Sequence, residues 1–408
     1  MSKEKRRVPR LRFPGFTGDW EQRKLESLFT KYVDKVNTPD SGYWRLGLRS
    51  HCKGTFHTYV DAGQELETTE MYRVKAGNFI LNITFAWERA LAVTDDEDQG
   101  KLVSHRFPQF KPNDDLVIDF FKHTLTDKRF KHHLELSSPG GAGRNKVLKV
   151  SDMLKFELLV PSIQEQNIIS SFLNNVDHII TLHQRKLNHL ILKKKSLLQK
   201  LFPKNGDCYP ELRFPGFTDA WEQRKLDDIA KIKTGGGTPK TANPEYWSGN
   251  IPWIQSSDLV EGDIVHVNIN KFISNNALKN SAAKLISRDS IALVTRVGVG
   301  KVAVINQDFT TSQDFLSLSD FDGSDIKFLA YQLYRLMQEN AKVLQGTSIK
   351  GITKTELIEQ SISIPKSDQE QNLISNVLSK IDSIITLHQR KLDHMQLQKK
   401  ALLQQLFV

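Results

Sequence analysis

Two stretches of the chain carry apolar residues at alternating steps of three and four, with polar residues between them. The first includes Phe172, Val176, Ile179, Leu187, Leu190, Leu197 and Leu201, and the second includes Ile374, Val377, Ile381, Ile384, Leu392, Met395, Leu402 and Leu406. This spacing is typical of a coiled-coil seam. It predicts two long helices that begin just after prolines, with Ser162 and Ser367 as N-caps.

The two predicted helices match each other in length and register. An amphipathic helix more often lies on its own globular domain, but the match favours pairing of these two. Because a whole domain separates them in sequence, we expect an antiparallel pair. At about 1.5 Å per residue, about 40 residues would form a rod of roughly 60 Å.

Polar residues interrupt the predicted seam at His183 and His388 and at Lys194 and Lys399. Two histidines in a seam suggest metal binding, but no carboxylate or cysteine cluster is spaced to complete such a site. The favoured interpretation is that these residues fix the register of the helices, and we expect no metal ion.

The regions before the two helices have the pattern of mixed α/β segments with short strands. The expected strands are 77–85, 89–95 and 155–161 in the first region, and 249–259, 290–305 and 360–366 in the second. We expect a helix that begins at 115 in the first region and one over 325–344 in the second. Both lead into a loop with glycine and basic residues, at 137–150 and 345–355, so the order of elements agrees.

An internal repeat organises the chain. "LRFPGFTGDWEQRKL" at 11–25 recurs as "LRFPGFTDAWEQRKL" at 212–226, and "IITLHQRKL" occupies both 179–187 and 384–392. Each half therefore has a fixed opening, a divergent middle and a fixed ending, which predicts a pseudo-two-fold molecule.

The fold class that follows is α/β (α+β), with two globular domains separated by two long helices in an antiparallel coiled coil. The expected boundaries are 1–160 for the first domain, 161–204 for the first helix, 205–364 for the second domain and 365–408 for the second helix. The "LRFPGF" stretches are expected to fasten each domain to the helices, or to form part of a partner-docking surface.

Composition narrows the class of protein. The 408 residues include 39% hydrophobic and 25% charged residues, as in ordinary folded proteins, and the net charge of +10 suits a polyanionic partner. Cys52 and Cys208 are too few for a disulfide framework. No apolar run is as long as a bilayer span, so we expect a cytoplasmic protein without a membrane partner.

Two motifs could be mistaken for enzyme signatures. "TGGGTPK" at 234–240 lacks the Lys-Ser/Thr pair that follows the last glycine of a phosphate-binding loop. "NPEYW" at 243–247 is similar to the Asn-Pro-Pro-Tyr signature of DNA amino-methyltransferases, but a turn before "SGNIPW" is the favoured interpretation. No plausible Ser/His/Asp set and no nuclease-like carboxylate cluster is visible.

The layout as a whole resembles the DNA specificity subunit of type I restriction-modification enzymes. The resemblance rests on 235–259, on "GTSIKGITKTEL" at 346–357 and on the paired "EQN" and "IITLHQRKL" segments of the long helices. It extends over essentially the whole chain and is weaker in the first middle region, which lacks "GGTP" and "NPEYW".

The resemblance implies a non-catalytic chain with two target recognition domains, each of which reads half of a split, asymmetric DNA site. The conserved helices would act as a ruler and would bind methyltransferase subunits, of which we expect two, and restriction subunits would join through the assembled complex. No cofactor is expected in this chain; S-adenosylmethionine, ATP and magnesium would bind to partner subunits.

Basic and polar residues of the divergent middles are the candidates for DNA contacts. In the first domain they are Arg45, Arg49, Lys53, Arg144, Lys146 and Lys149; in the second they are Lys233, Thr238, Lys240, Gln255, Ser256, Arg296, Lys350 and Lys354. The hairpin expected over 290–305 would present Arg296 with Lys301. The rival functions are a DNA methyltransferase or nuclease acting by itself and a coiled-coil scaffold that binds proteins.

Overall fold

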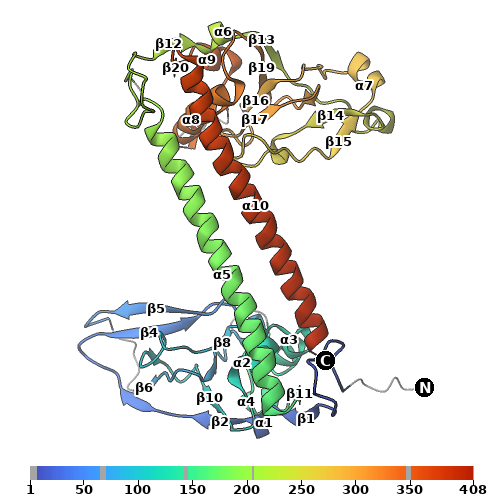
Figure 1. Ribbon diagram of the computed structural model, residues 1–408. Coiled ribbons are helices and arrows are strands. Elements are labelled where there is room, and N and C mark those ends of the chain that lie inside the picture. The colour runs from blue at the N-terminus through green and yellow to red at the C-terminus, as the bar shows by residue number, and fades with distance from the viewer. Residues whose placement is uncertain (1–6, 65–69, 142–145, 205, 346–350, 408) are drawn as a thin grey trace. The chain divides into compact units, whose positions relative to one another are not determined.

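The computed structural model describes residues 7–64, 70–141, 146–204, 206–345 and 351–407 (Figure 1). The chain divides into two compact units. Unit 1 consists of Met1–Leu182 with Leu392–Val408, and unit 2 consists of His183–Lys391. Each unit therefore combines a globular part with a piece of both long helices.

The two long helices are α5 (Ile163–Lys200) and α10 (Asp368–Leu406), and their existence confirms the prediction from the seam. Within unit 2, contacts from His183 to Lys194 on α5 meet α10 in descending order, from His388 to Asp382, so the helices run antiparallel. The amide of Glu165 donates to Ser162 Oγ over 3.4 Å, as expected of an N-cap. No described helix is long and apolar enough to cross a membrane.

The apolar stripe of the long helices differs from the expected seam in one respect. Ile179 and Ile384 were placed in the seam, but they are 44% and 42% exposed. Near the starts of the helices, Ile169 and Ile374 are instead buried in the cores of their own units. The buried face there follows the globular core, so a single coiled-coil period does not describe the whole helix.

Unit 1 contains a two-stranded, a four-stranded and a five-stranded sheet. The strand orders are β1 (Glu21–Lys24) with β11 (Glu157–Val160); β2 (Phe29–Tyr32), β10 (Gln109–Pro112), β7 (Phe79–Leu81) and β8 (Leu91–Val93); and β3 (Lys35–Asn37), β6 (Glu70–Arg73), β9 (Leu102–Val103), β4 (Tyr43–Leu48) and β5 (Thr55–Val60). Its shorter helices are α1 (Leu25–Leu28), η1 (Ala86–Glu88), α2 (Ile118–Lys122), η2 (His123–Thr126), α3 (Lys128–Leu136) and α4 (Val150–Met153).

Unit 2 repeats the two-stranded and four-stranded sheets and has a three-stranded sheet in place of the five-stranded one. The strand orders are β12 (Glu222–Lys225) with β20 (Ser361–Ile364); β13 (Ala230–Gly235), β19 (Phe315–Phe321), β16 (Ser290–Val294) and β17 (Val302–Ile305); and β15 (Lys271–Ile273), β14 (Ile251–Ile254) and β18 (Thr310–Thr311). Its shorter helices are α6 (Leu226–Ile229), η4 (Pro244–Trp247), η5 (Ser256–Asp258), α7 (Asn275–Asn280), α8 (Ile326–Gln345) and α9 (Lys354–Ile358).

The helix expected to begin at 115 is broken, whereas the one expected over 325–344 is the continuous α8. In unit 1 the first helix ends after one turn and continues as η2. Asp127 then adopts an extended conformation, and its side chain accepts a hydrogen bond from the amide of Arg129 over 2.7 Å. An Asp that caps a new helix in this way stops the preceding one from continuing.

The duplicated "LRFPGF" stretches hold each domain to the helices. The guanidinium of Arg12 donates twice to Glu165 of α5, and that of Arg213 donates twice to Glu370 of α10. The Leu11 amide donates to the Gln405 carbonyl over 3.0 Å. Within unit 1 the first stretch thus meets the end of α10, as its expected role at the junction requires.

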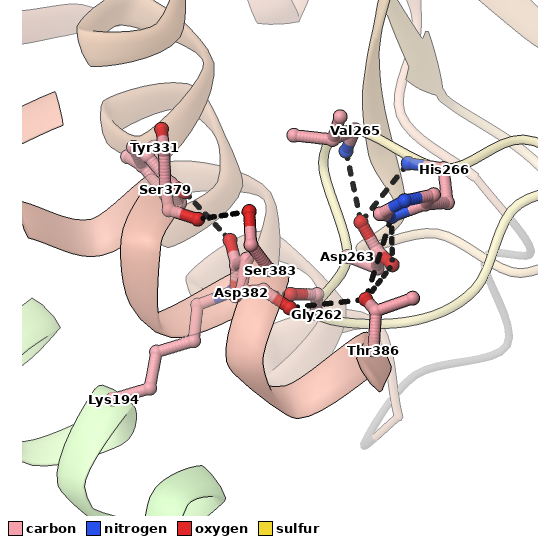
Figure 2. A network of polar contacts seen from close by, with 10 residues as sticks. All are labelled: Lys194, Gly262, Asp263, Val265, His266, Tyr331, Ser379, Asp382, Ser383 and Thr386. Carbon is pink, nitrogen blue, oxygen red and sulfur yellow. Dashed lines mark hydrogen bonds and ion pairs between the residues drawn. The ribbon is translucent and has the colours of Figure 1, made fainter. Parts of the chain in front are cut away.

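A buried polar network joins the helices to the second domain within unit 2 (Figure 2). Lys194 of α5 forms an ion pair with Asp382 of α10 and donates to the Gly262 carbonyl. The hydroxyl of Tyr331, on α8, donates to Asp382 over 2.6 Å. Asp263, next to Gly262, accepts from Thr386 of α10 over 3.4 Å. Three helices and one loop of the domain are therefore tied together.

Candidate nucleic-acid interface

Each unit brings together a β-hairpin tip and a basic loop. In unit 2 the tip is 295–301, between β16 and β17, and the amide of Ile352 in the basic loop donates to the Thr295 carbonyl over 2.8 Å. In unit 1 the tip is 82–90, between β7 and β8, and the amide of Leu148 donates to the Ile83 carbonyl over 2.8 Å. The two divergent middles therefore position the same two segments in the same way.

The hairpin tip of unit 2 lies beside the segment that follows β14. Arg296 is exposed at the tip, and the ammonium of Lys301 donates to the carbonyl of Ser256 over 2.9 Å. The neighbouring Gln255 accepts from Lys271 over 3.2 Å. These contacts gather Gln255, Ser256 and Arg296, three of the predicted DNA contacts, into one patch.

The glycine-rich "TGGGTPK" stretch packs closely against other backbone segments. A Cβ atom at Gly237 would collide with the backbone of Ala282, and the Gly237 carbonyl accepts from the indole of Trp253 over 3.1 Å. These glycines therefore permit close backbone approach. At the end of the stretch, the Thr238 hydroxyl donates to Gln313 over 2.5 Å.

The "NPEYW" stretch forms the single 3₁₀ turn η4, in agreement with the turn that was expected. Asn243 accepts from the amide of Glu245 over 3.2 Å, and Trp247 packs edge-on against Trp253 with ring centroids 5.0 Å apart. The indole of Trp247 donates to the backbone carbonyl of Lys240 over 3.3 Å. The side chain of Lys240 is exposed.

Two further lysines of unit 2 meet at the other end of the basic loop. The ammonium of Lys233 lies 2.8 Å from the carboxylate of Asp227 and lowers the pKa of that group through a hydrogen bond and its charge. Lys354 donates to the Lys233 carbonyl over 3.2 Å. The ammonium of Lys233 therefore already has an anionic partner, while Lys350 lies outside the described residues.

In unit 1 the turn between β4 and β5, which carries Arg49 and Lys53, is fastened to the hairpin tip. The amide of His51 donates to the Glu88 carbonyl over 2.8 Å, and that of Cys52 donates to the Arg89 carbonyl over 2.9 Å. His51, Cys52 and Arg89 adopt positive φ values of 64°, 56° and 60°. Such backbone conformations are costly for these residues, so the surrounding contacts hold the turn in place.

The remaining candidates of unit 1 occupy several places. The ammonium of Lys146 lies 4.9 Å from the centroid of the Trp87 ring at the hairpin tip. Lys149 is exposed just before α4, and Arg45 lies within β4 opposite Thr58, away from the turn. Arg144 lies outside the described residues. The structure thus brings Arg49, Lys53 and Lys146 to the tip and leaves Arg45 apart from them.

Sequence reasoning missed Trp87, Arg89 and Lys271. Trp87 lies between the strands expected over 77–85 and 89–95, and Arg89 begins the second of them. This is the same turn from which Arg296 was chosen in unit 2, so the parallel could have revealed both residues. Lys271 has no such signal. It reaches Gln255 only because β15 pairs with β14 in the register that sets Lys271 opposite Trp253.

Both patches are rich in hydrogen-bond donors and in cations. Arg296 and Lys301 at one tip, and Arg89 with Lys146 at the other, suit a polyanion whose edges carry acceptor atoms. Over the described part of the chain, no three His, Cys, Asp or Glu side chains converge in a way that could hold a metal ion.

Known proteins with similar sequences are specificity subunits. The MjaIX specificity subunit of a type I restriction enzyme from Methanocaldococcus jannaschii is 33% identical over 171 residues, which cover 40% of this chain and 38% of the relative. The MjaX specificity subunit of the same organism is 22% identical over 407 residues, which cover 94% of this chain and 92% of the relative. The chain thus matches well under half the length of the first relative.

The fold agrees with that of a solved structure. The S subunit of a type I restriction-modification system from M. genitalium superimposes with a TM-score of 0.62 at 13% identity, over 98% of this chain and 99% of that one. The family model described as the type I restriction modification DNA specificity domain matches residues 17–192 and 218–396. The chain therefore belongs to the family of type I restriction-modification DNA specificity domains and carries two copies of that domain.

Proposed function

We propose that the chain is the non-catalytic DNA specificity subunit of a type I restriction-modification complex. The observation that carries this proposal is the presence of two copies of the family domain, each with a hairpin tip and a basic loop held together. Each unit would place its tip against one half of a split DNA site. Lysines and arginines would hold the phosphates, and a few side chains would reach the base edges.

The two half-sites would differ in sequence. Unit 1 offers Arg49, Lys53 and Lys146 beside Trp87, whereas unit 2 offers Gln255, Lys271 and Arg296. Because direct readout depends on which donors and acceptors are presented, different side chains on similar frames select different bases. An asymmetric, bipartite recognition site follows from this proposal.

The long helices would set the unread gap between the half-sites. Helices of 38 and 39 residues extend for roughly 60 Å at about 1.5 Å per residue. That length is somewhat less than two turns of duplex at roughly 34 to 36 Å per turn. The protein would therefore make no contact with the bases between the two half-sites.

The same helices would recruit two copies of a methyltransferase subunit. Each unit exposes four apolar side chains at matching positions of the repeat, and apolar residues that recur on a helix surface are typical of docking faces. They are Ile168, Ile179, Leu182 and Leu397 in unit 1, and Leu373, Ile384, Leu387 and Leu192 in unit 2. Two equal faces suit two equal partners, and restriction subunits would join through them.

The chemistry would take place on those partners. S-adenosylmethionine would bind to the methyltransferase subunits, and ATP and magnesium to the assembled complex, so this chain would need no cofactor of its own. Since methyl transfer to a base in duplex DNA requires that the base leave the stack, the chain would help to hold distorted DNA. Such a complex would act on DNA in the cytoplasm.

The function can be tested by methylation of random DNA libraries with and without methyltransferase partners. We expect a bipartite methylated motif only when the partners are present. Methylation by this chain alone would support the rival enzyme and contradict the proposal. Partner binding without any methylated motif would support the rival protein scaffold.

The number of partners can be tested by native mass spectrometry of the complex. Leu182→Asp should release one methyltransferase copy, Leu387→Asp should release the other, and the double variant should release both. Loss of both copies from either single variant would contradict two independent faces. Gln389→Asp, on an exposed part of α10 that faces away from the apolar set, is the matched control.

The ruler can be tested by the insertion of four residues after Asn188 and after Asp393, which occupy matching positions of the two helices. One added turn of about 5.4 Å in both should lengthen the unread gap by about one or two base pairs. Both half-site sequences should stay the same. Altered half-sites with an unchanged gap would refute the ruler.

A further inference from the structure

Gln255 and Lys271 form a fixed pair on the surface of unit 2. Trp253 pairs with Lys271 across β14 and β15, and this register directs the Lys271 ammonium to Gln255 Oε1, 3.2 Å away. The same ammonium lies 5.4 Å from the centroid of the Trp253 ring, which is itself buried. Strand pairing and the ring therefore hold the lysine in position.

The contact determines which way the Gln255 amide faces. A lysine ammonium can only donate hydrogen bonds, so the atom that it meets must be the oxygen of the amide. The Gln255 backbone is fixed as well, because its amide donates to the carboxylate of the buried Asp258 over 2.9 Å. The NH₂ group of Gln255 is thus turned away from Lys271, and no described residue accepts a hydrogen bond from it.

Neighbouring groups add further donors to this patch. Lys301 uses one of its three protons on the Ser256 carbonyl, and Arg296 is exposed on the hairpin tip. The carboxylate of Asp258 is buried and accepts from the backbone N–H of Gln255 and the hydroxyl of Ser257. The outward edge formed by Gln255 and Lys271 therefore offers two adjacent donor groups, while one lone pair of the amide oxygen is already used.

Two adjacent donors match one base edge of DNA especially well. In the major groove guanine presents two neighbouring acceptors, N7 and O6, whereas adenine pairs an acceptor with a donor and cytosine presents a donor. Thymine presents a single acceptor beside a methyl group. We infer that Gln255 and Lys271 together read a guanine in the half-site of unit 2; this inference rests on the proposed function.

The test is the methylated motif of variants assembled with the methyltransferase partners. Gln255→Glu keeps the size of the side chain and an oxygen for Lys271, but it removes both N–H donors. We expect methylation of sites with guanine at one position of the second half-site to fall about 10- to 100-fold. Cytosine, whose amino group donates, should become the preferred base there. Lys271→Met should weaken the selection of guanine at the same position.

The half-site read by unit 1 is an internal control, because its retention shows that the variant is folded and assembled. Gln307→Glu makes the same change of charge beyond the end of β17 farthest from the hairpin tip and should leave the motif unchanged. A second half-site without guanine, or an unchanged motif and rate in Gln255→Glu, would overturn the inference and leave the proposed function standing. The absence of any bipartite motif with the unaltered chain would instead overturn the proposed function.

Discussion

The two units contain the same junction between α5 and α10, but they bury it to different depths. In unit 2 the side chains of Lys194 and Asp382 are 7% and 4% exposed. In unit 1 the matching residues of the repeat, Lys399 and Asp177, form an ion pair whose side chains are 26% and 41% exposed. Gly262, which accepts from Lys194, lies in the loop that joins β14 to β15, two strands of the three-stranded sheet that unit 1 lacks.

The helix residue beside this ion pair also differs between the units. Phe328 packs on Trp221 in unit 2 with ring centroids 5.7 Å apart, and Phe120 packs on Trp20 in unit 1 at 5.8 Å. Three residues after these phenylalanines stand Tyr331 and His123. Burial and the charge of Lys399 lower the pKa of His123 to about 4. The aromatic packing at the junction is therefore the same in both units, while the polar residue beside it differs.

The largest expected difference between the junctions comes from removal of the lysines. Lys194→Met leaves Asp382 charged and buried without its partner, and we expect unit 2 to lose about 3 to 5 kcal/mol of stability. Lys399→Met removes a solvent-exposed pair and should cost unit 1 less than about 1 kcal/mol. Hydrogen exchange of amides in each unit measures both losses separately.

A double variant is the control for this prediction. Lys194→Met with Asp382→Leu removes both charges and should restore much of the stability, since no buried charge is left unpaired. Equal losses from the two single lysine variants would show that the depth of burial does not distinguish the junctions.

The second difference concerns pH. The pKa of His123 is lowered from 6.5 to about 4 in the folded protein, so between these values the unfolded chain binds more protons. The stability contributed by neutral His123 is therefore present above about pH 6.5 and is lost as the pH falls towards 4, by up to roughly 3 kcal/mol. Burial raises the pKa of Tyr331, so that residue stays neutral throughout this window.

This effect should appear as lower protection of the α2 and α3 amides at pH 4 than at pH 7, when exchange at each pH is compared with the intrinsic rate of an unprotected amide at that pH. His123→Phe should abolish the dependence in unit 1, while exchange in α8 should not respond to that substitution. A pH dependence in α2 and α3 that persists in His123→Phe would assign the loss of stability to other groups.

The smallest difference concerns the two arginines of the "LRFPGF" stretches. Arg12 and Arg213 pair with Glu165 and Glu370, and each glutamate is 1% exposed. Glu370 also accepts from the indole of Trp221 over 3.4 Å, whereas the indole nitrogen of Trp20 has no hydrogen-bond partner among the described residues. Arg12→Leu should therefore destabilise its unit by about 1 kcal/mol more than Arg213→Leu does.

Chemical denaturation of the two arginine variants, followed by exchange in each unit, measures that difference. In a Trp221→Phe background the difference should disappear, because Glu370 then has no second donor. A larger cost for Arg213→Leu would mean that the two junctions rely on their arginines for different reasons.

Much of the frame could be predicted because its signals are local. The period of three and four in α5 and α10, each copy of the repeated segments and the hairpin that carries Arg296 all lie within short stretches of sequence. The five-stranded sheet of unit 1 could not be predicted, since β9 has two residues and pairs with β4 at Arg45 and Leu102, which are distant in sequence.

The candidate site was predictable to a similar extent. Arg296 and Gln255 were found because they lie within the recognisable strand stretches 290–305 and 249–259, but their mutual placement depends on the contact between Lys301 and Ser256. The occupied ammonium of Lys233 could not be foreseen, because its acidic partner Asp227 lies at a spacing that has no regular structural meaning. DNA contacts by the individual candidates stay predictions.

The hydrogen bond between Leu11 and Gln405 has a consequence for the order of folding. The first domain leaves the ribosome early, but its core includes Leu406, and Trp20 packs against Phe407 with ring centroids 6.4 Å apart. Domains made first usually fold first during synthesis. Here the half that is made first cannot complete its core until Leu406 and Phe407 emerge, and unit 2, which ends at Lys391, can be finished before it.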